Sequence, residues 1–128
     1  MTTALKARSF VPTLTADDLD RSVRFYEGLG FTITEKMEEE GKVLGVMMDA
    51  GGSTLGISQD DFAKGKERVK GVGMRLYLET DQDIETLANQ AIQAGIRLDQ
   101  GPAPLPWGPM GFTVTDPDGF RLTISKPS

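Results

Sequence analysis

The 128-residue sequence contains no cysteine and no histidine. Without cysteine, the chain has no disulfide, no thiolate nucleophile and no cysteine-ligated zinc. Without histidine, it lacks the commonest metal ligand and the usual general base near neutral pH. These two absences bear on function more than any residue type that is present.

Long apolar runs and an excess of positive charge are also missing. No apolar segment approaches the roughly 18 residues that span a bilayer, and no apolar h-region follows the first basic residues. Lys and Arg total 14 against 19 Asp and Glu, which gives a formal net charge of −5. Because an acidic domain repels a phosphate backbone, we expect a cytoplasmic protein with no nucleic-acid partner and no membrane partner.

What is present is typical of one globular domain over residues 1–128. Hydrophobic residues make up 38% and charged residues 26% of the chain, which is close to ordinary usage for a packed core. Hydrophobic periodicity and turn residues predict an α+β fold in the order βαβββ, connector, βαβββ. The first module covers 5–58, the connector 59–73 and the second module 74–126.

The expected elements follow from apolar spacing and from the glycine and proline positions. One helix starts within Thr15–Asp18 and ends at Gly28–Gly30; a second covers 81–94, with Ile84, Leu87, Ala88, Ala91 and Ile92 as its buried set. Strands are expected at 6–14, 31–36, 43–49, 53–58, 74–79, 96–98, 111–115 and 120–125.

The two modules also match in sequence at nearly constant offsets. Gly30-Phe31 corresponds to Gly95-Ile96, and Leu55-Gly56-Ile57 corresponds to Leu122-Thr123-Ile124. Asp18-Leu19 corresponds in the same way to Asp83-Ile84. Matches in register indicate a duplicated unit, and chance similarity between two α+β stretches is the alternative.

Three segments carry a family resemblance. Residues 18–26, Asp-Leu-Asp-Arg-Ser-Val-Arg-Phe-Tyr, are followed by Leu29-Gly30-Phe31, and 112–119 read Phe-Thr-Val-Thr-Asp-Pro-Asp-Gly. Pro106-Trp107-Gly108 precedes that second segment. Together they resemble the glyoxalase/bleomycin-resistance/dihydroxybiphenyl dioxygenase (vicinal oxygen chelate) superfamily, and Pro106-Trp107-Gly108 is similar to its bleomycin-resistance branch.

The resemblance implies a fold and an assembly. Each βαβββ module would curl its sheet into a half-open cup with the helix on the convex side, and two modules would form a curved half-barrel cup around a cavity. Members are usually homodimers, some of which pair modules across subunits. We interpret the motifs as fold markers, in which Phe25, Tyr26 and Phe31 fill space between helix and sheet and Asp116–Gly119 forms a tight turn.

The resemblance also implies where a metal would be held in an enzyme of this type. Its four ligand positions, usually His or Glu, fall on Val11, Gly56, Arg75 (or Met74, one register away) and Thr123. Valine and glycine side chains cannot ligate, a guanidinium repels a cation, and one threonine hydroxyl is a poor ligand. We therefore predict no metal site and no cofactor.

Strand alternation then predicts what lines the cavity instead. Arg75, Tyr77 and Glu79 alternate with core leucines, and Arg121 and Thr123 alternate with Leu122 and Ile124. The candidate ligand-binding residues are therefore Arg75, Tyr77, Trp107, Arg121 and Thr123. No catalytic residue is assigned, and Glu79 and Tyr77 are the only weak candidates for such a role.

Each of these residues also has a purely structural interpretation. Arg75 and Arg121 can hold a carboxylate or phosphate, or they can pair with Glu79 or another acid, or face solvent. Trp107 can stack on a planar ligand, plug the core or contact a dimer partner. The basic residues of the connector, from Lys64 to Lys70, are expected in a solvated loop, with a mobile lid as the alternative.

These observations favour a metal-free protein that binds a small molecule, such as an antibiotic or another planar or anionic ligand. The alternative is a metal-independent or atypical enzyme of the glyoxalase type, a lyase, isomerase or dioxygenase. An interaction module without a ligand is a further alternative. The expected partners are a small-molecule ligand and a second copy of the chain.

Overall fold

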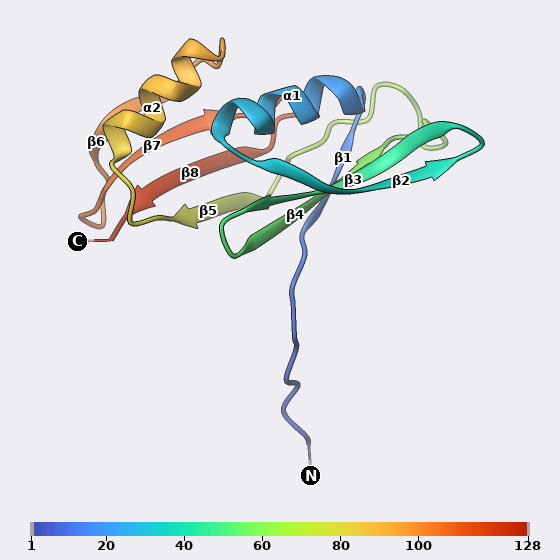
Figure 1. The fold of residues 1–128 in the computed structure, drawn as a ribbon, viewed down its shortest axis with the longest axis horizontal. Coiled ribbons are helices and arrows are strands. Elements are labelled where there is room, and N and C mark those ends of the chain that lie inside the picture. Colours follow the sequence, from blue (N-terminus) through green and yellow to red (C-terminus); the bar gives the residue numbers. More distant parts are fainter. Residues whose placement is uncertain (1, 128) are drawn as a thin grey trace.

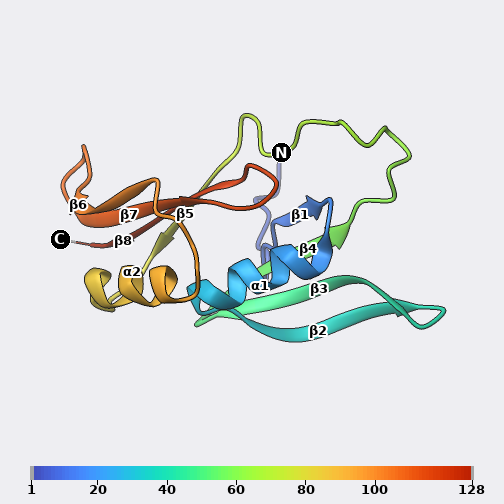
Figure 2. The ribbon, with the colours of Figure 1, turned by 90° about the horizontal axis from the view of Figure 1, so that it is seen from above.

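The computed structural model describes residues 2–127 and contains two four-stranded sheets, each with one helix (Figure 1). The elements are β1 (Thr13–Ala16), α1 (Leu19–Leu29), β2 (Thr32–Glu39), β3 (Lys42–Ala50), β4 (Ser53–Gln59), β5 (Arg75–Glu79), α2 (Ile84–Gln93), β6 (Gln100–Pro104), β7 (Met110–Thr115) and β8 (Arg121–Lys126). Both helices lie on the same side of the sheets, and Figure 2 shows them from above, one after the other.

The two modules repeat the same topology. The strand orders are β1-β4-β3-β2 and β5-β8-β7-β6, with β1 parallel to β4 and β5 parallel to β8. The matched residues Asp18 and Asp83 are both helix N-caps, and each accepts a hydrogen bond from the backbone N–H three residues later. The sheets are open, so the predicted α+β fold of two βαβββ modules forming a curved cup is confirmed.

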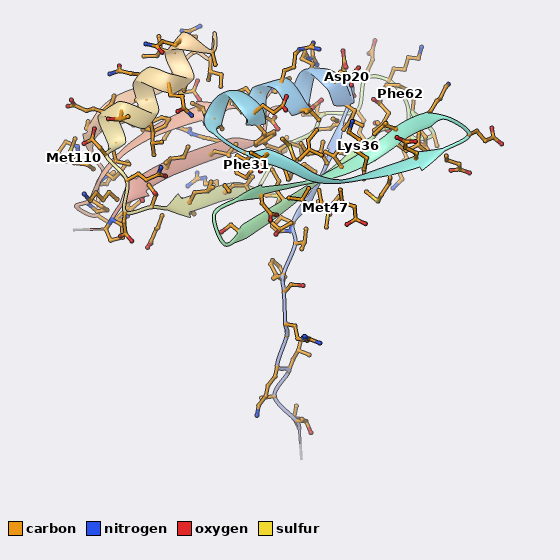
Figure 3. The ribbon with its side chains drawn as sticks, in the orientation of Figure 1. Asp20, Phe31, Lys36, Met47, Phe62 and Met110 are labelled. Atoms are coloured by element: carbon orange, nitrogen blue, oxygen red, sulfur yellow. The ribbon has the colours of Figure 1, made fainter. Side chains whose placement is uncertain are left out.

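The core lies between the sheets and the helices. Its members alternate along the strands with residues of the opposite face, as Val46 and Met48 do with Met47. Figure 3 places Phe31 beneath α1 and Met47 on the side away from the helix. No helix in residues 2–127 is long and apolar enough to cross a membrane.

Two predicted strands are displaced in the structure. The strand expected at 6–14 is β1, Thr13–Ala16, and residues 2–12 form an arm with no strand that projects away from the side of the helices (Figure 1). Pro12 has no N–H to donate to a ladder, although its carbonyl accepts from the Gly56 N–H at 2.8 Å. The strand expected at 96–98 is instead β6, Gln100–Pro104, an edge position that tolerates proline.

Two helix expectations are also wrong. Ile92, expected to be buried, is 53% exposed. Gly28 lies inside α1 rather than ending it, and α1 ends at Gly30 in the left-handed conformation. A Cβ on Gly28 would come within 2.9 Å of the Ala94 Cβ, so this glycine lets α1 approach the end of α2.

The two family motifs bond to each other across the modules. Tyr26 is completely buried in α1, and its hydroxyl donates to Oδ2 of Asp116 at 2.7 Å. Asp116 Oδ1 accepts from the backbone N–H groups of Asp118 and Phe120, both at 2.9 Å. Burial raises the pKa of Asp116 against the lowering effect of these bonds, and burial followed by the charge of Asp116 raises the pKa of Tyr26. The tyrosine, read as a space filler from sequence, therefore also joins the modules.

Asp118 adds two further bonds to the start of α1. Its Oδ1 accepts from the Asp17 N–H at 3.0 Å, and its Oδ2 accepts from the Ser22 hydroxyl at 3.1 Å. Ser22 is buried. We call the four-residue turn Asp116–Gly119 with its bonds to Tyr26, Ser22 and Asp17 the inter-module latch.

The connector is fastened beside the latch at one end. The side chain of Lys70 is only 4% exposed, and its ammonium lies 2.8 Å from Asp60 Oδ2 and 2.5 Å from Asp17 Oδ1. These bonds raise the pKa of Lys70, and the Lys70 ammonium is the main cause of the lowered pKa of Asp60. Gly71 packs directly on Gly119, whose backbone carbon would lie 2.3 Å from an added Cβ. The expectation of a solvated loop is therefore wrong for Lys70.

We predict that Tyr26→Phe lowers the free energy of unfolding by about 1.5–3 kcal/mol, because it removes a hydrogen bond to a buried charged group. Asp116 has a raised pKa, so its titration contributes stability that is present below its ordinary pKa and lost as pH rises through the raised value. The hydroxyl favours the carboxylate form, so the loss should be larger at about pH 7 than at about pH 4. Urea unfolding at both pH values measures it.

Tyr77→Phe is the matched control, since Tyr77 is the other tyrosine and is 58% exposed. It should change stability by about 0.5 kcal/mol or less. Equal losses in the two variants, or a Tyr26→Phe loss that is independent of pH, would contradict the role given to the latch.

Candidate functional site

The residues at the four family ligand positions lack the imidazole and carboxylate donors of the family's metal site. Val11 lies in the arm, and an added Cβ on Gly56 would meet the Thr13 hydroxyl at 2.7 Å and the Met47 sulfur at 3.3 Å. In residues 2–127, no group of three or more His, Cys, Asp or Glu side chains is placed to hold a metal. The donors present at these positions therefore do not fit the family's metal.

Strand pairing places Val11 and Arg75 each two residues away from the partners of Gly56 and Thr123. Gly56 lies opposite Thr13 rather than Val11, and Thr123 lies opposite Tyr77 rather than Arg75. The same shift occurs in both modules, as expected of a repeat. Thr13 and Tyr77 offer only neutral hydroxyl groups, which are poor ligands for a divalent cation beside the imidazole and carboxylate groups of the family.

The structure brings several predicted site residues together on one face of the second sheet. Tyr77 lies opposite Thr123, and Arg75 lies opposite Arg121. Their neighbours Leu122 and Ile124 are buried in the core, so this face points away from the helices. Trp107, in the loop between β6 and β7, stands edge-to-face against Tyr77 with ring centroids 5.9 Å apart.

Small hydroxyl residues make up the middle of this face. Thr113, Thr123 and Ser125 are all buried. Thr113 lies opposite Thr123, and within residues 2–127 its hydroxyl has no hydrogen-bond partner. A buried hydroxyl without a partner costs stability.

A groove of about 1080 Å³ lies between the two modules. Its walls come from the arm, the end of α1, the β3–β4 turn, β5 and α2, and they combine apolar side chains such as Phe31, Leu55 and Leu78 with a few polar ones such as Thr54 and Gln90. Tyr77 and Glu79 line it.

A second hollow of about 590 Å³ lies at the start of β5. Arg75 and Arg121 line it, with Thr115, Gly71, Gly73 and Gly119. The predicted site residues are therefore divided between the two hollows. The arginines line the second hollow, and Tyr77 lines the groove and contacts Trp107. Thr123 is buried opposite Tyr77 in the strand ladder.

Sequence reasoning missed the groove walls that come from α2 and from the end of α1. Gln90 and Leu87 belong to α2, and Leu29 and Phe31 to the end of α1. Their part in the groove depends on how the modules pack. The helix spacing of Leu87 and Gln90 carries no signal that a hollow lies beside them.

Glu79, one of the two weak catalytic candidates, lies opposite Ser125 at the end of β5. It is the only carboxylate among the described residues that line the groove. General acid–base catalysis usually needs a second titrating group or a matched pKa, and no other acidic side chain lines this groove.

Comparison with known proteins identifies the family. The model of the Glyoxalase/Bleomycin resistance protein/Dioxygenase superfamily matches residues 9–124, and the chain belongs to this superfamily. Among curated proteins, none matches the chain in sequence.

Solved structures of the same fold are similar at low sequence identity. A superfamily member from Sphaerobacter thermophilus DSM 20745 is 20% identical with a TM-score of 0.75, covering 95% of this chain and 98% of its own. TioX from Micromonospora sp. ML1 is 19% identical with a TM-score of 0.74, covering 94% and 98%. A Burkholderia phytofirmans PsJN superfamily enzyme is 19% identical with a TM-score of 0.71, covering 91% and 95%. At these identities the likeness defines the fold alone.

We predict that Thr113→Val stabilises the protein by about 1 kcal/mol, because it removes the cost of burying an unpaired hydroxyl in a side chain of similar size. Thr54→Val is the matched control. Its hydroxyl donates to Asp49 at 2.8 Å, and its loss should cost about 0.5–1.5 kcal/mol. Urea unfolding of the two variants is the measurement, and a destabilised Thr113→Val would show that the hydroxyl is paired.

Proposed function

We propose that the protein is a metal-free, cytoplasmic, bleomycin-resistance-like binding protein that holds a planar small molecule, such as an antibiotic, in the groove between its modules. The groove beside the Tyr77–Trp107 pair is the observation that carries the proposal. The ligand enters without a cofactor, and no step of chemistry is required of the chain.

The size and walls of the groove support a small-molecule ligand. A volume of about 1080 Å³ is near the upper end of the range of about 300–1,000 Å³ for ligand pockets. Apolar walls with a few polar groups give affinity from burial and orientation from hydrogen bonds. Gln90 and Thr54 supply amide and hydroxyl groups without a net charge.

The aromatic pair supports a planar ligand. Tyr77 and Trp107 are 58% and 60% exposed although their rings contact each other. A third ring placed against them would bury apolar surface and add the favourable geometry of an aromatic contact. Neither side chain is needed to fill the core.

The donor set supports binding rather than the metal-dependent chemistry of the superfamily. Val11, Gly56, Arg75 and Thr123 offer no carboxylate or imidazole where metalloenzymes of the family have them. The alternative is a metal-independent lyase or isomerase that uses Glu79 and Tyr77, and the single carboxylate of the groove gives it less support.

The test uses Trp107, the only tryptophan of the chain. We expect bleomycin, or the neutral planar probe naphthalene-2-carboxamide, to raise the Tm and to change the Trp107 fluorescence. Trp107→Ala and Tyr77→Ala should each weaken binding about 10-fold or more, which corresponds to about 1.4 kcal/mol. Isothermal calorimetry gives the affinities.

Leu44→Ala is the control variant, because Leu44 is an exposed apolar side chain on β3 in the other sheet. It should bind as the parent does. If none of the planar probes binds, or if binding requires a divalent metal or survives both aromatic substitutions, the proposed function is wrong.

We also propose that the protein is a homodimer in which the arm, residues 2–12, packs on a second copy. Leu5 and Phe10 are 90% and 88% exposed on the arm, and its last residues, from Arg8 to Pro12, line the groove. Within residues 2–127, β5 pairs with β8 alone, so its other edge can accept an extended segment. A second copy would bring such a segment and would bury both side chains.

Sedimentation of the full chain should give a dimer, and a chain lacking residues 2–10 or carrying Phe10→Ser should dissociate at least 10-fold more readily, because burial of a phenylalanine is worth about 1.5–3 kcal/mol. Val69→Ser in the connector is the control, since Val69 is also exposed. A monomeric full chain, or a dimer that is indifferent to the arm, would contradict this arrangement.

A further inference from the structure

Two arginines stand side by side at the start of the parallel β5–β8 strand pair, at one edge of the second sheet. Arg75 of β5 and Arg121 of β8 are direct partners in the parallel ladder, on strands that lie about 4.8 Å apart. Leu122, next to Arg121, is buried in the core with Leu76 packed against it. Both arginine side chains therefore lie on the face of the sheet that points away from the helices.

Within residues 2–127, neither guanidinium group forms an ion pair with an acidic side chain. In the described residues, all ion pairs belong to Lys70 and Arg68. Thr115 is the partner of Arg121 on β7, and its hydroxyl donates to Asp99 at 2.5 Å. Like charges placed opposite one another in a sheet are destabilising, and both arginines are exposed, so we expect the pair to cost the ligand-free chain a small amount of stability.

The surroundings of the pair are open and include three glycines. The hollow of about 590 Å³ has Gly71, Gly73 and Gly119 in its wall. Gly73 has no atom within 4 Å of an added Cβ. Within residues 2–127, the N–H groups of Gly71 and Gly73 donate no hydrogen bond, and N–H groups in such turns are a common source of anion contacts.

We propose that this hollow binds a phosphate monoester group of a small molecule, with Arg75 and Arg121 as its two charged ligands. A phosphate monoester carries about −1.5 to −2 charges near neutral pH, which matches two guanidinium groups, whereas a carboxylate neutralises one. Arginine also presents parallel N–H donors to two oxygens of one phosphate.

The position of the pair connects it with the aromatic residues, so this inference rests on the proposed function where it concerns the whole ligand. Tyr77 follows Arg75 by two residues on the same face, a separation of about 6.5 Å along a strand. A ring attached to the phosphate would then lie near Tyr77 and Trp107. The ligand class assigned by the structure is therefore an aryl phosphate.

The direct test is an NMR titration of the full chain with inorganic phosphate, at constant ionic strength set with chloride. We expect saturable shifts centred on the amides of Gly71, Gly73 and Arg121. Arg75→Met and Arg121→Met should each weaken binding by about 10-fold or more. The double variant Lys64→Met/Lys66→Met, which removes two positive charges from the connector, should bind as the parent does.

Thermal unfolding separates a ligand-binding role from a structural one. If the arginines exist for an anion, Arg121→Met should keep or raise the Tm without ligand, by up to about 4 °C, because it relieves repulsion, and should abolish the rise that phosphate gives to the parent. A lower Tm without ligand would assign Arg121 a structural role and overturn the proposal.

Linked probes distinguish this inference from the proposed function. We expect 2-naphthyl phosphate to bind more tightly than phosphate or naphthalene-2-carboxamide alone, because the two contacts then act in one molecule. Phosphate binding that is lost only in the arginine variants supports the anion site even if the neutral amide fails to bind. Shifts spread over all basic residues, or 2-naphthoate binding as tightly as 2-naphthyl phosphate, would contradict a phosphate site.

Discussion

The hydrogen bond between Tyr26 and Asp116 holds the two halves of this protein in one arrangement. Each module alone is an open four-stranded sheet with one helix, and neither sheet pairs with the other by backbone hydrogen bonds. The buried carboxylate of Asp116 is tolerable only because one hydroxyl and two backbone N–H groups donate to it. Since the bond is directional, it fixes the turn at Asp116–Gly119 relative to α1, which a purely apolar contact would not do.

The hollows of the molecule follow from that fixed arrangement. The groove has walls from both modules, so its shape depends on how α1 and the second sheet are set against each other. The second hollow lies where the connector, fastened by Lys70 to Asp17 and Asp60, meets the start of β5 and the latch turn. A single cluster of buried polar contacts therefore positions both candidate binding surfaces.

In the described part of the chain, several polar side chains of the candidate sites lack an ion-pair or hydrogen-bond partner. Arg75 and Arg121 face each other without an acid, and the hydroxyl of Thr113 is buried without a partner. Elsewhere the chain pairs its buried polar groups, as at Tyr26 and Lys70. A buried polar group without a partner costs stability, and functional sites are among the places where proteins retain such groups.

The sequence alone determined the fold class and the limits on the chemistry. Local propensities and caps act over a few residues, so hydrophobic periodicity was enough to predict the order of the elements. Asp18 and Gly30 marked the caps of α1, although Gly28 was wrongly included in its end. The absence of histidine, together with Val11, Gly56, Arg75 and Thr123 at the family's ligand positions, was enough to predict from sequence that these positions lack the family's metal ligands.

Only the tertiary structure decided which residues share a surface. Strand alternation predicted that Arg75, Tyr77, Arg121 and Thr123 share one face. Which of them lie opposite one another, and how they are divided between two hollows, depends on strand pairing and on the packing of the modules. The arm before β1 and the low exposure of the Lys70 side chain could likewise not be predicted from the sequence, because exposure depends on contacts between distant segments. Whether a residue lines a groove is a property of neighbours that the sequence does not place next to it.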